Sequence, residues 1–215
     1  MTKDEILRRC DHTVLRPEAG FKEIAENCEL AIKFNCASMC LAPSHVYEAK
    51  KLCGDRLKIC TVVGFPNGYN DTATKVFEAA HLIEEGADEI DAVINLGWAC
   101  SGMYAAVEDE LKQLRKATEG YILKIIVETC RLPEPVFREI CRVVSLSGAD
   151  FIKTSTGFAE RGATLEDVLT MRRECAPETK IKAAGGISSF EDAEKLISAG
   201  ADRLGTSRLV KLMLT

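Results

Sequence analysis

The sequence predicts an α/β fold, a (β/α)8 TIM barrel that occupies residues 1–215 as a single domain. Short β-type runs alternate with amphipathic stretches, and no linker or low-complexity segment interrupts the alternation. A chain of 215 residues with 47% hydrophobic content can bury one sizeable core. An open flavodoxin-like sheet with extra units is the alternative. In both folds ligands bind at the carboxyl ends of the strands, so residues late in each strand are the candidates for a site.

Strands and helices are expected in strict alternation. Helix-start signals at Asp71 (or Asn70), Thr164 and Ser189 (or Ser188) precede three of the amphipathic stretches. Helices are expected at 18–34, 44–53, 72–85, 101–118, 134–147, 164–175 and 190–199, with a short helical piece at 208–214. Strands are expected at 9–14, 37–42, 57–65, 89–95, 122–128, 150–154, 180–185 and 203–206.

A Gly-Ala-Asp tripeptide recurs in the chain, at residues 86–88, 148–150 and 200–202. Each copy follows a predicted helix, where a glycine in the left-handed conformation commonly ends the helix, so the tripeptide predicts the turn into the next strand. Three strands that begin alike are expected to bring three different groups to one height. Those groups are a carboxylate, an amine and a bare backbone, found five residues after each glycine at Asp91, Lys153 and Gly205.

Two lysines stand late in apolar strands. Burial of Lys153 would desolvate its ammonium group and favour the free amine. Lys182 is placed similarly on the next strand. Adjacent strands lie about 4.8 Å apart, so two inward-pointing lysines would each disfavour the other's charge, and we expect one of them to be a free amine near neutral pH. Such an amine can form a Schiff base with a carbonyl substrate. Ion-paired structural lysines are the alternative.

Asp91 stands among apolar residues in "EIDAVIN" and needs a partner. The partner could be one of the two lysines in a structural ion pair, or Asp91 could act as a general acid/base, and both could hold at once. Lys58 and Lys124 stand early in their strands. For these two we expect a solvated structural role at the opposite face of the barrel.

Glycine-rich segments follow the last two strands. In barrel enzymes the loops after strands seven and eight often bind phosphate through backbone N–H groups, which glycine allows to approach an anion closely. Ordinary tight turns are the alternative for either segment alone, but together they favour phosphate. The candidates are Gly185, Gly186, Gly205 and Ser207.

Composition and cysteine spacing exclude several classes of protein. A net charge of -5 with dispersed basic residues argues against nucleic acid and anionic membrane as partners. No apolar run reaches the roughly 18 residues of a membrane span. The ten cysteines include no CxxC pair and the N-terminus lacks the apolar segment of a signal peptide, so we expect reduced thiols in the cytoplasm. Cys36 and Cys40 have no further ligand at zinc spacing, so neither a metal nor another cofactor is expected.

Seven motifs stand in order along the chain: "DHTVLRPEA" at 11, "TVVGFPNG" at 61, "KVFEAAHLIEEGADEIDAVINLG" at 75, "IIVETC" at 125, "GADFIKTSTGF" at 148, "IKAAGGI" at 181 and "LGTS" at 204. This set resembles the deoxyribose-phosphate aldolase family. The resemblance implies a metal-free class I aldolase, an aldehyde-lyase of deoxyribonucleotide catabolism. Its reaction would convert 2-deoxy-D-ribose 5-phosphate reversibly into D-glyceraldehyde 3-phosphate and acetaldehyde. The implied partners are these small molecules and further copies of the chain, in a dimer or tetramer.

The resemblance also implies roles for individual residues. It gives the Schiff base to Lys153, activation of that amine and a proton relay to Lys182, and acid/base chemistry to Asp91. Substrate contacts are implied for Asp11, Thr13, Cys40 and Thr154, and phosphate contacts for Gly157, Gly185, Gly186 and Ser207. For Cys40 a buried, inert thiol is the alternative to one that faces the site.

The chain departs from the family pattern at a few positions. Arg16 stands where the family often has lysine, and Arg208 and Leu209 replace a common pair of small residues. Arg208 could add charge to the phosphate site or face solvent. The sequence ends at Thr215, without the tyrosine-ended tail of some longer members. We therefore expect water or the Asp91–Lys182 pair to carry any proton transfer that such a tail assists.

Two other functions remain as alternatives. One is a different Schiff-base barrel aldolase that acts on another sugar phosphate or a keto acid. The motifs of those families are absent, and no carboxylate-binding group is evident near the lysines. The other is a degenerate barrel that only binds a ligand. Such a barrel would be expected to have lost a lysine or Asp91, whereas all three residues are present.

Overall fold

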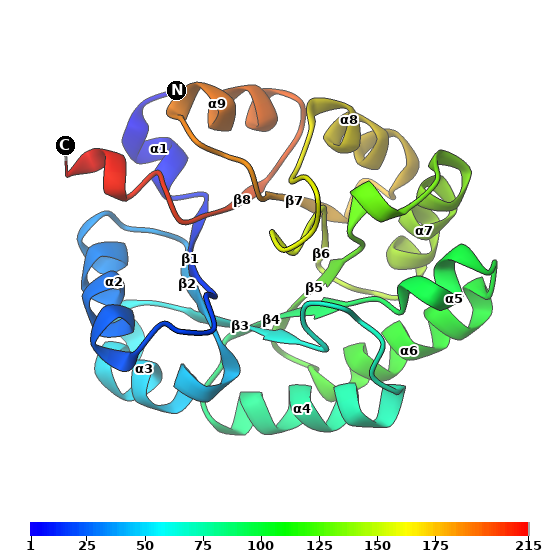
Figure 1. Cartoon of the computed structure of the whole chain (residues 1–215), viewed down its shortest axis with the longest axis horizontal. Helices are drawn as coiled ribbons and strands as arrows, with labels where there is room; N and C mark the ends of the chain where they lie inside the picture. Colours follow the sequence, from blue (N-terminus) through cyan, green and yellow to red (C-terminus); the bar gives the residue numbers. More distant parts are fainter. Residues whose placement is uncertain (215) are drawn as a thin grey trace.

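The structure, a computed structural model that describes residues 1–214, is a closed barrel of parallel strands surrounded by helices (Figure 1). Each strand pairs with the next in sequence and β8 pairs with β1. This closure confirms the predicted (β/α)8 barrel and excludes the open sheet. The strands are β1 (Cys10–Val14), β2 (Ser38–Leu41), β3 (Ile59–Val63), β4 (Glu89–Val93), β5 (Ile122–Ile126), β6 (Phe151–Lys153), β7 (Lys180–Ala184) and β8 (Arg203–Thr206).

The helices lie close to their expected positions, with two differences. α1 was not expected, although Thr2 and Glu5 form a capping box at its start. The expected helix 101–118 is preceded by a short helix, α5, and Gly102 at φ 73° separates the two. The helices are α1 (Lys3–Leu7), α2 (Phe21–Lys33), α3 (Val46–Cys53), α4 (Thr72–Glu84), α5 (Leu96–Cys100), α6 (Tyr104–Ala117), α7 (Glu134–Leu146), α8 (Leu165–Glu174) and α9 (Phe190–Ser198). Short 3-10 turns are η1 (Pro43–His45), η2 (Gly54–Arg56), η3 (Thr129–Arg131) and η4 (Lys211–Met213).

The Gly-Ala-Asp tripeptides are the turns into even-numbered strands, as predicted. Their glycines have positive φ, at 107° for Gly86, 78° for Gly148 and 116° for Gly200. The aspartates have a further role that the sequence did not reveal. Each carboxylate accepts a hydrogen bond from a backbone N–H in the strand before its own: Asp88 from Ile59 at 2.9 Å, Asp150 from Leu123 at 2.8 Å and Asp202 from Ile181 at 2.8 Å. The tripeptide therefore ties each of these strands to its neighbour.

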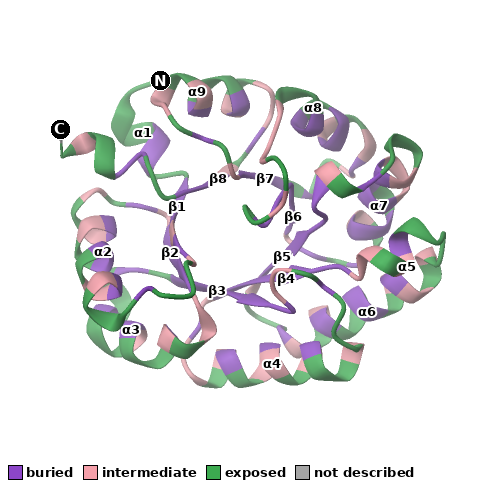
Figure 2. Ribbon diagram, in the orientation of Figure 1, coloured by how far each residue is buried: buried purple, intermediate pink, exposed green. Residues whose placement is uncertain are grey.

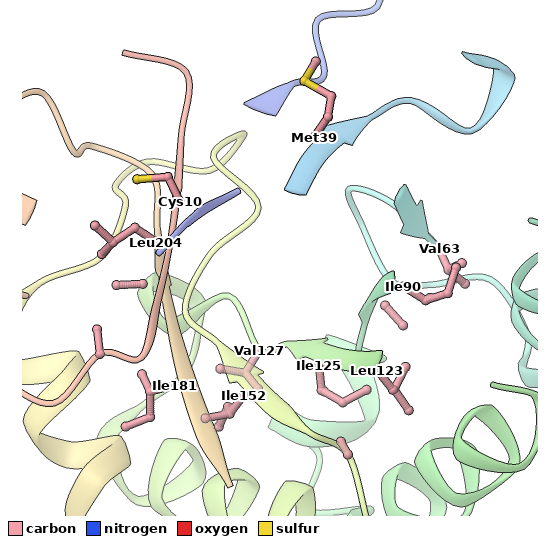
Figure 3. Close-up of a cluster of buried hydrophobic side chains, with 14 of the residues drawn as sticks. Cys10, Met39, Val63, Ile90, Leu123, Ile125, Val127, Ile152, Ile181 and Leu204 are labelled. Atoms are coloured by element: carbon pink, nitrogen blue, oxygen red, sulfur yellow. The ribbon is translucent and has the colours of Figure 1, made fainter. Parts of the chain in front are cut away.

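Apolar side chains on the outer surface of the strands pack against the helices. Figure 2 shows the helices buried on the side that faces the barrel and exposed on the other. Figure 3 shows part of this layer, including Ile90 on β4, Ile125 on β5 and Ile152 on β6. Because side chains alternate along a strand, the residues between them point into the barrel. These inward residues are largely charged.

The inward side chains form levels, each supplied by alternate strands. Barrel strands are tilted, with a shear of about eight residues around the barrel. Residues of one level are therefore not hydrogen-bonded partners, because the level shifts by about one residue towards the carboxyl end at each step to the next strand. Asp91 pairs with Lys124, which pairs with Phe151, and Lys153 follows two positions later on the same level as Asp91. From the floor upward, the levels are Ser38, Glu89, Phe151 and Arg203, then Asp11, Cys60, Lys124 and Lys182, then Cys40, Asp91, Lys153 and Gly205.

Candidate active site

Asp91 joins the two predicted lysines. Its Oδ2 lies 2.7 Å from Lys153 Nζ and 2.7 Å from Lys182 Nζ. The carboxylate is fully buried, and Lys153 is 3% exposed. Lys153 reaches it from the same level and Lys182 from the level below. The spacing after the Gly-Ala-Asp turns therefore predicted a real contact.

Lys182 lies between two carboxylates. Its Nζ also contacts Asp11 Oδ2, and the side chain is fully buried. Burial alone would lower the pKa of Lys182, but Asp11 and Asp91 raise it above the ordinary lysine value. Gly205 leaves room for this side chain, because a Cβ there would lie 3.1 Å from Lys182 Cε and 2.9 Å from Ala184 Cβ. Lys182 is therefore a fixed cation beside Lys153.

The expectation of a solvated Lys124 was wrong. Lys124 is fully buried in the barrel, where its Nζ lies 2.8 Å from Asp91 Oδ1 and 2.5 Å from Glu89 Oε2. Burial would lower the pKa of Lys124, but Asp91 and the other acidic groups around it raise it well above the ordinary value. Lys58 does have the expected role, since it is exposed at the start of its strand and pairs with Asp88 at 3.1 Å.

The buried carboxylates are held in the charged form. Burial would raise the pKa of Asp91, but the charges of Lys124, Lys153 and Lys182 lower it well below the ordinary value. Burial has the same effect on Asp11, whose pKa is lowered by Lys182, Lys124 and Arg203. Arg203 reaches Asp11 Oδ1 at 2.6 Å from the floor of the barrel. The interior is thus one ionic network from the floor to Lys153.

Lys153 opens into a cavity of about 670 Å³ at the carboxyl ends of the strands. Gly157, Gly185 and Gly186 line it with positive φ angles of 87°, 80° and 75°. A side chain at any of them would be strained, whereas glycine leaves the backbone N–H groups uncovered. The other predicted residues in the lining are Thr13, Gly205 and Ser207, together with the basic residues Arg16, Arg208 and Lys211.

Asp11, Cys40 and Thr154 are fully buried, and the cavity lining, as described for residues 1–214, includes none of them. Asp11 contacts Lys182 and Arg203 instead. Thr154 Oγ1 accepts from Ala184 N at 3.0 Å and so links the residue after β6 to the end of β7. Cys40 is fully buried, and a hydrogen bond from Cys60 lowers its pKa. Each of these residues can affect a ligand only through its neighbours.

Sequence reasoning missed several residues of this region. Lys124, Glu89 and Arg203 complete the ionic network, and Thr156 and Phe158 line the cavity. The inward position of Lys124 could have been inferred from the alternation in "LKI", where Leu123 and Ile125 are buried against the helices. Glu89 pairs with Lys124 and Arg203 with Asp11 across neighbouring strands, and no local sequence signal identifies these pairs.

A family model described as DeoC/LacD family aldolase matches residues 6–206. The chain belongs to this aldolase family. Deoxyribose-phosphate aldolase of Streptococcus agalactiae is 51% identical over 213 residues, which cover 99% of this aldolase and 96% of the relative. The Streptococcus pyogenes enzyme of the same name is 50% identical over the same shares of both chains. The family expected from the motifs is confirmed.

Solved structures agree with this assignment. A putative deoxyribose-phosphate aldolase from Coccidioides immitis superposes with a TM-score of 0.94 at 36% identity, over 98% of this aldolase and 85% of the other chain. Deoxyribose phosphate aldolase from Aeropyrum pernix, described as a unique tetramer, gives 0.92 at 29% identity, over 99% of this aldolase and 91% of the other chain. These matches confirm the barrel fold over nearly the whole length.

Proposed function

We propose that Lys153 is the nucleophilic amine of this aldolase, that Asp91 and Lys182 move its protons, and that the glycine-lined rim binds the substrate phosphate. The activity is that of deoxyribose-phosphate aldolase, a lyase that interconverts 2-deoxy-D-ribose 5-phosphate with D-glyceraldehyde 3-phosphate and acetaldehyde. The observation that carries the assignment is the pair of 2.7 Å contacts from Asp91 to Lys153 and Lys182 at the base of the cavity. The proposed roles of Lys153, Asp91 and Lys182 follow from this geometry.

The chemistry begins when the Lys153 amine attacks the C1 carbonyl carbon of the open-chain sugar. Loss of water from the carbinolamine gives an iminium ion. A base then takes the proton of the C3 hydroxyl, the C2–C3 bond breaks, and its electron pair moves to the iminium as an enamine. Glyceraldehyde 3-phosphate leaves, C2 takes up a proton, and hydrolysis of the imine releases acetaldehyde and free Lys153. Asp91 contacts both lysines and is the nearest carboxylate for these proton transfers.

The charges of the barrel levels balance without Lys153. Among residues 1–214, the barrel levels hold the carboxylates Asp11, Glu89 and Asp91 and, besides Lys153, the cations Lys124, Lys182 and Arg203. These six charges cancel. A protonated Lys153 would be a further charge in this network, and the proposed mechanism requires the amine to lose that proton before it attacks the carbonyl carbon.

The phosphate proposal is supported by the loops after β7 and β8, which line the mouth of the cavity. Gly185 and Gly186 follow β7, Ser207 follows β8, and their loops lie next to each other around the mouth. Arg208 and Lys211 belong to the same lining and add positive charge near these N–H groups. A phosphate bound here would extend the sugar towards Lys153. We assign Arg208 to this electrostatic role, since it lines the cavity.

We further infer that residues 1–215 act as one catalytic domain and that copies of the chain form a homo-oligomer. The family match over residues 6–206 supports the first inference, and the tetramer described for the Aeropyrum pernix relative supports the second. The ten cysteines are free thiols, which supports a reducing compartment such as the cytoplasm. Across residues 1–214, no helix combines the length and apolarity needed to cross a membrane. Thr215, where the tail of longer relatives would begin, lies outside the described residues.

The direct test is cleavage of 2-deoxyribose 5-phosphate, followed by coupled detection of glyceraldehyde 3-phosphate. We expect turnover by the wild type, none above background by Lys153→Met, and unchanged turnover by the matched Lys58→Met, whose lysine is exposed at the start of its strand. Turnover should also persist in EDTA. Activity lost in EDTA and restored by zinc would instead indicate a metal-dependent aldolase mechanism.

A further inference from the structure

We propose that Glu128 is a positioning residue, one that shapes the loop after β6 and thereby sets the affinity of this aldolase for the substrate phosphate. This inference rests on the proposed function. Glu128 follows β5 at the mouth of the barrel, and its carboxylate reaches across to Thr156, which lines the cavity. The residue touches neither Lys153 nor Asp91 in any contact described for residues 1–214.

The backbone of Glu128 is unusual. Its φ of 50° and ψ of 66° lie in the left-handed region, which residues other than glycine rarely adopt. Asn35 is the other such residue among the non-glycines of positions 1–214, and asparagine tolerates this conformation better than glutamate does. Strain of this kind persists where surrounding contacts fix it, and it is often found beside functional sites. Here the contacts that fix it involve the side chain.

The carboxylate of Glu128 organises the start of the next loop. It is 2% exposed, accepts from Thr156 N at 3.2 Å, and accepts from the Thr156 hydroxyl. Thr156 Oγ1 in turn accepts from Phe158 N at 3.1 Å. Both donors of Thr156 are therefore committed to Glu128 and do not compete for a substrate. Their effect is to fix the path of the chain through Gly157, which lines the cavity at φ 87°.

The same loop contacts the phosphate rim at its other end. A Cβ on Gly162 would lie 2.2 Å from the carbonyl oxygen of Gly185, so the two backbones touch without room for a side chain. Ala163 N also donates to Gly185 O at 3.2 Å. The loop thus runs from the Glu128 contact to the rim glycine, and a displacement at Thr156 would be passed to both Gly157 and Gly185. Loss of the Glu128 contact should therefore affect phosphate binding more than imine chemistry.

The test is Glu128→Gln, which keeps the size of the side chain but removes the negative charge of the oxygen that accepts from both donors of Thr156. We expect KM for 2-deoxyribose 5-phosphate to rise by about tenfold, the loss of roughly one charge-assisted hydrogen bond. The efficiency with unphosphorylated 2-deoxyribose should change much less, so the preference for the phosphorylated sugar should fall. Borohydride trapping of acetaldehyde should remain at the wild-type rate.

A matched control is Glu78→Gln. Glu78 also accepts from a backbone N–H of a mouth loop, Gly64 N at 2.8 Å, but neither residue lines the cavity. This variant should keep the wild-type preference for the phosphorylated sugar. Thr156→Val should lower the preference as Glu128→Gln does, and the double variant should lose no more than either single one, because both remove the same contact.

Equal losses with both sugars would show that Glu128 supports only the fold, and additive losses in the double variant would show that it does not act through Thr156. Either result overturns the inference. If Glu128→Gln does not fold, Thr156→Val alone decides, because an unchanged preference in that variant contradicts the role of the contact. Failure of the proposed function itself is distinguishable, since the wild type would then not cleave 2-deoxyribose 5-phosphate.

Discussion

Lys182 keeps its proton because Asp11 and Asp91 face its ammonium group from two sides. Both carboxylates are buried, and together they raise the pKa of Lys182 against the effect of its own burial. Of these two carboxylates Lys153 contacts only Asp91, and its side chain lines the cavity. Similar lysines on adjacent strands therefore differ in their surroundings. In the proposed mechanism Lys182 is the fixed charge and Lys153 is the attacking amine.

The variant Lys182→Met tests this division of roles. It roughly keeps side-chain length and removes the positive charge that contacts Asp91 beside Lys153, and so changes the charge balance around the attacking amine. We expect imine formation with acetaldehyde to be slow at neutral pH and to recover as the pH rises, seen as an alkaline shift of the acid limb of the borohydride-trapping rate. Turnover should recover less, because the proposed mechanism also has Lys182 relay protons with Asp91.

Lys180→Met provides the control for this experiment. Lys180 stands on the same strand but is exposed, and its Nζ lies 5.5 Å from the centre of the Phe151 ring. This variant should have the wild-type pH profile. An unshifted profile in folded Lys182→Met would mean that desolvation alone prepares Lys153 for attack.

The sequence identified Lys153, Lys182 and Asp91 but misjudged Lys124. Asp91, Lys124 and Lys182 are each the third residue of a five-residue strand, so position along the strand does not separate Lys124 from the other two. The tilt of the strands places Lys124 at the level of Lys182 inside the barrel. The burial of Lys124 depends on Glu89 and Asp91, which reach it from the neighbouring strand. Pairings of this kind are not visible in a single strand.

At the scale of elements, the loops after β6, β7 and β8 form the proposed phosphate rim. Each supplies glycine or serine to the lining, at Gly157, Gly185, Gly186 and Ser207. Unphosphorylated 2-deoxyribose should consequently be a much poorer substrate. Hydrogen bonds to a charged group contribute roughly 1.5–3 kcal/mol each, so losing two should reduce kcat/KM by about a hundredfold or more. The measurement is kcat/KM for the two sugars in parallel, and equal values would contradict the rim as a phosphate site.

The elements themselves were largely predictable from periodicity and turn signals. Thr164 and Ser189 cap α8 and α9 in capping boxes, and Asp71 caps α4, as their spacing indicated. The break between α5 and α6 was missed because Gly102 was placed inside one amphipathic stretch. The loops were less predictable, since the loop after β6 is contacted by Glu128 from the loop after β5. Local signals set helices and strands, whereas contacts between elements set the rim.

At the scale of the whole molecule, the ionic interior should govern stability against pH. Asp11 and Asp91 have lowered pKa values in the fold, so their contribution is present above an unfolded value of about 3.9 and is lost as the pH falls through the folded values. Lys124 and Lys182 have raised pKa values, so their contribution is lost only above about pH 10.4.

Buried thiols should reduce the stability of the fold at a lower alkaline pH than the lysines do. Burial raises the pKa of Cys36 to about 12, and the thiol in the unfolded chain ionises near pH 8.5, so stability falls as the pH rises above that value. Burial lowers the pKa of His12, so the unfolded chain binds a proton first and some stability is lost as the pH falls below about 6.5. We expect the thermal midpoint, measured by calorimetry under reducing conditions, to be nearly constant from about pH 7 to 8, to fall slightly below that range through His12, and to fall steeply only below about pH 4. A steep fall that is complete above about pH 4 would contradict the lowered pKa values of the buried aspartates.

The closed barrel could be predicted from the alternation of strands and helices in the sequence, but the arrangement of charges inside the barrel could not. Closure depends on the number of βα units, which the sequence displays directly. The balance between carboxylates and cations depends on the register of each strand pair, because a shift of one residue would turn Lys124 or Arg203 out of the barrel. The Gly-Ala-Asp aspartates help to fix that register through bonds such as Asp150 to Leu123 N.

The central claim is that Lys153 carries the imine. Borohydride reduces an imine to a stable amine, so incubation with acetaldehyde and borohydride should attach an ethyl group to the lysine that forms the Schiff base. We predict that peptide mapping finds the modification predominantly on Lys153, and that the exposed Lys58 and Lys180 carry no more label in the wild type than in Lys153→Met, which measures non-specific ethylation. Modification of Lys182 or Lys124 in place of Lys153 would contradict the account.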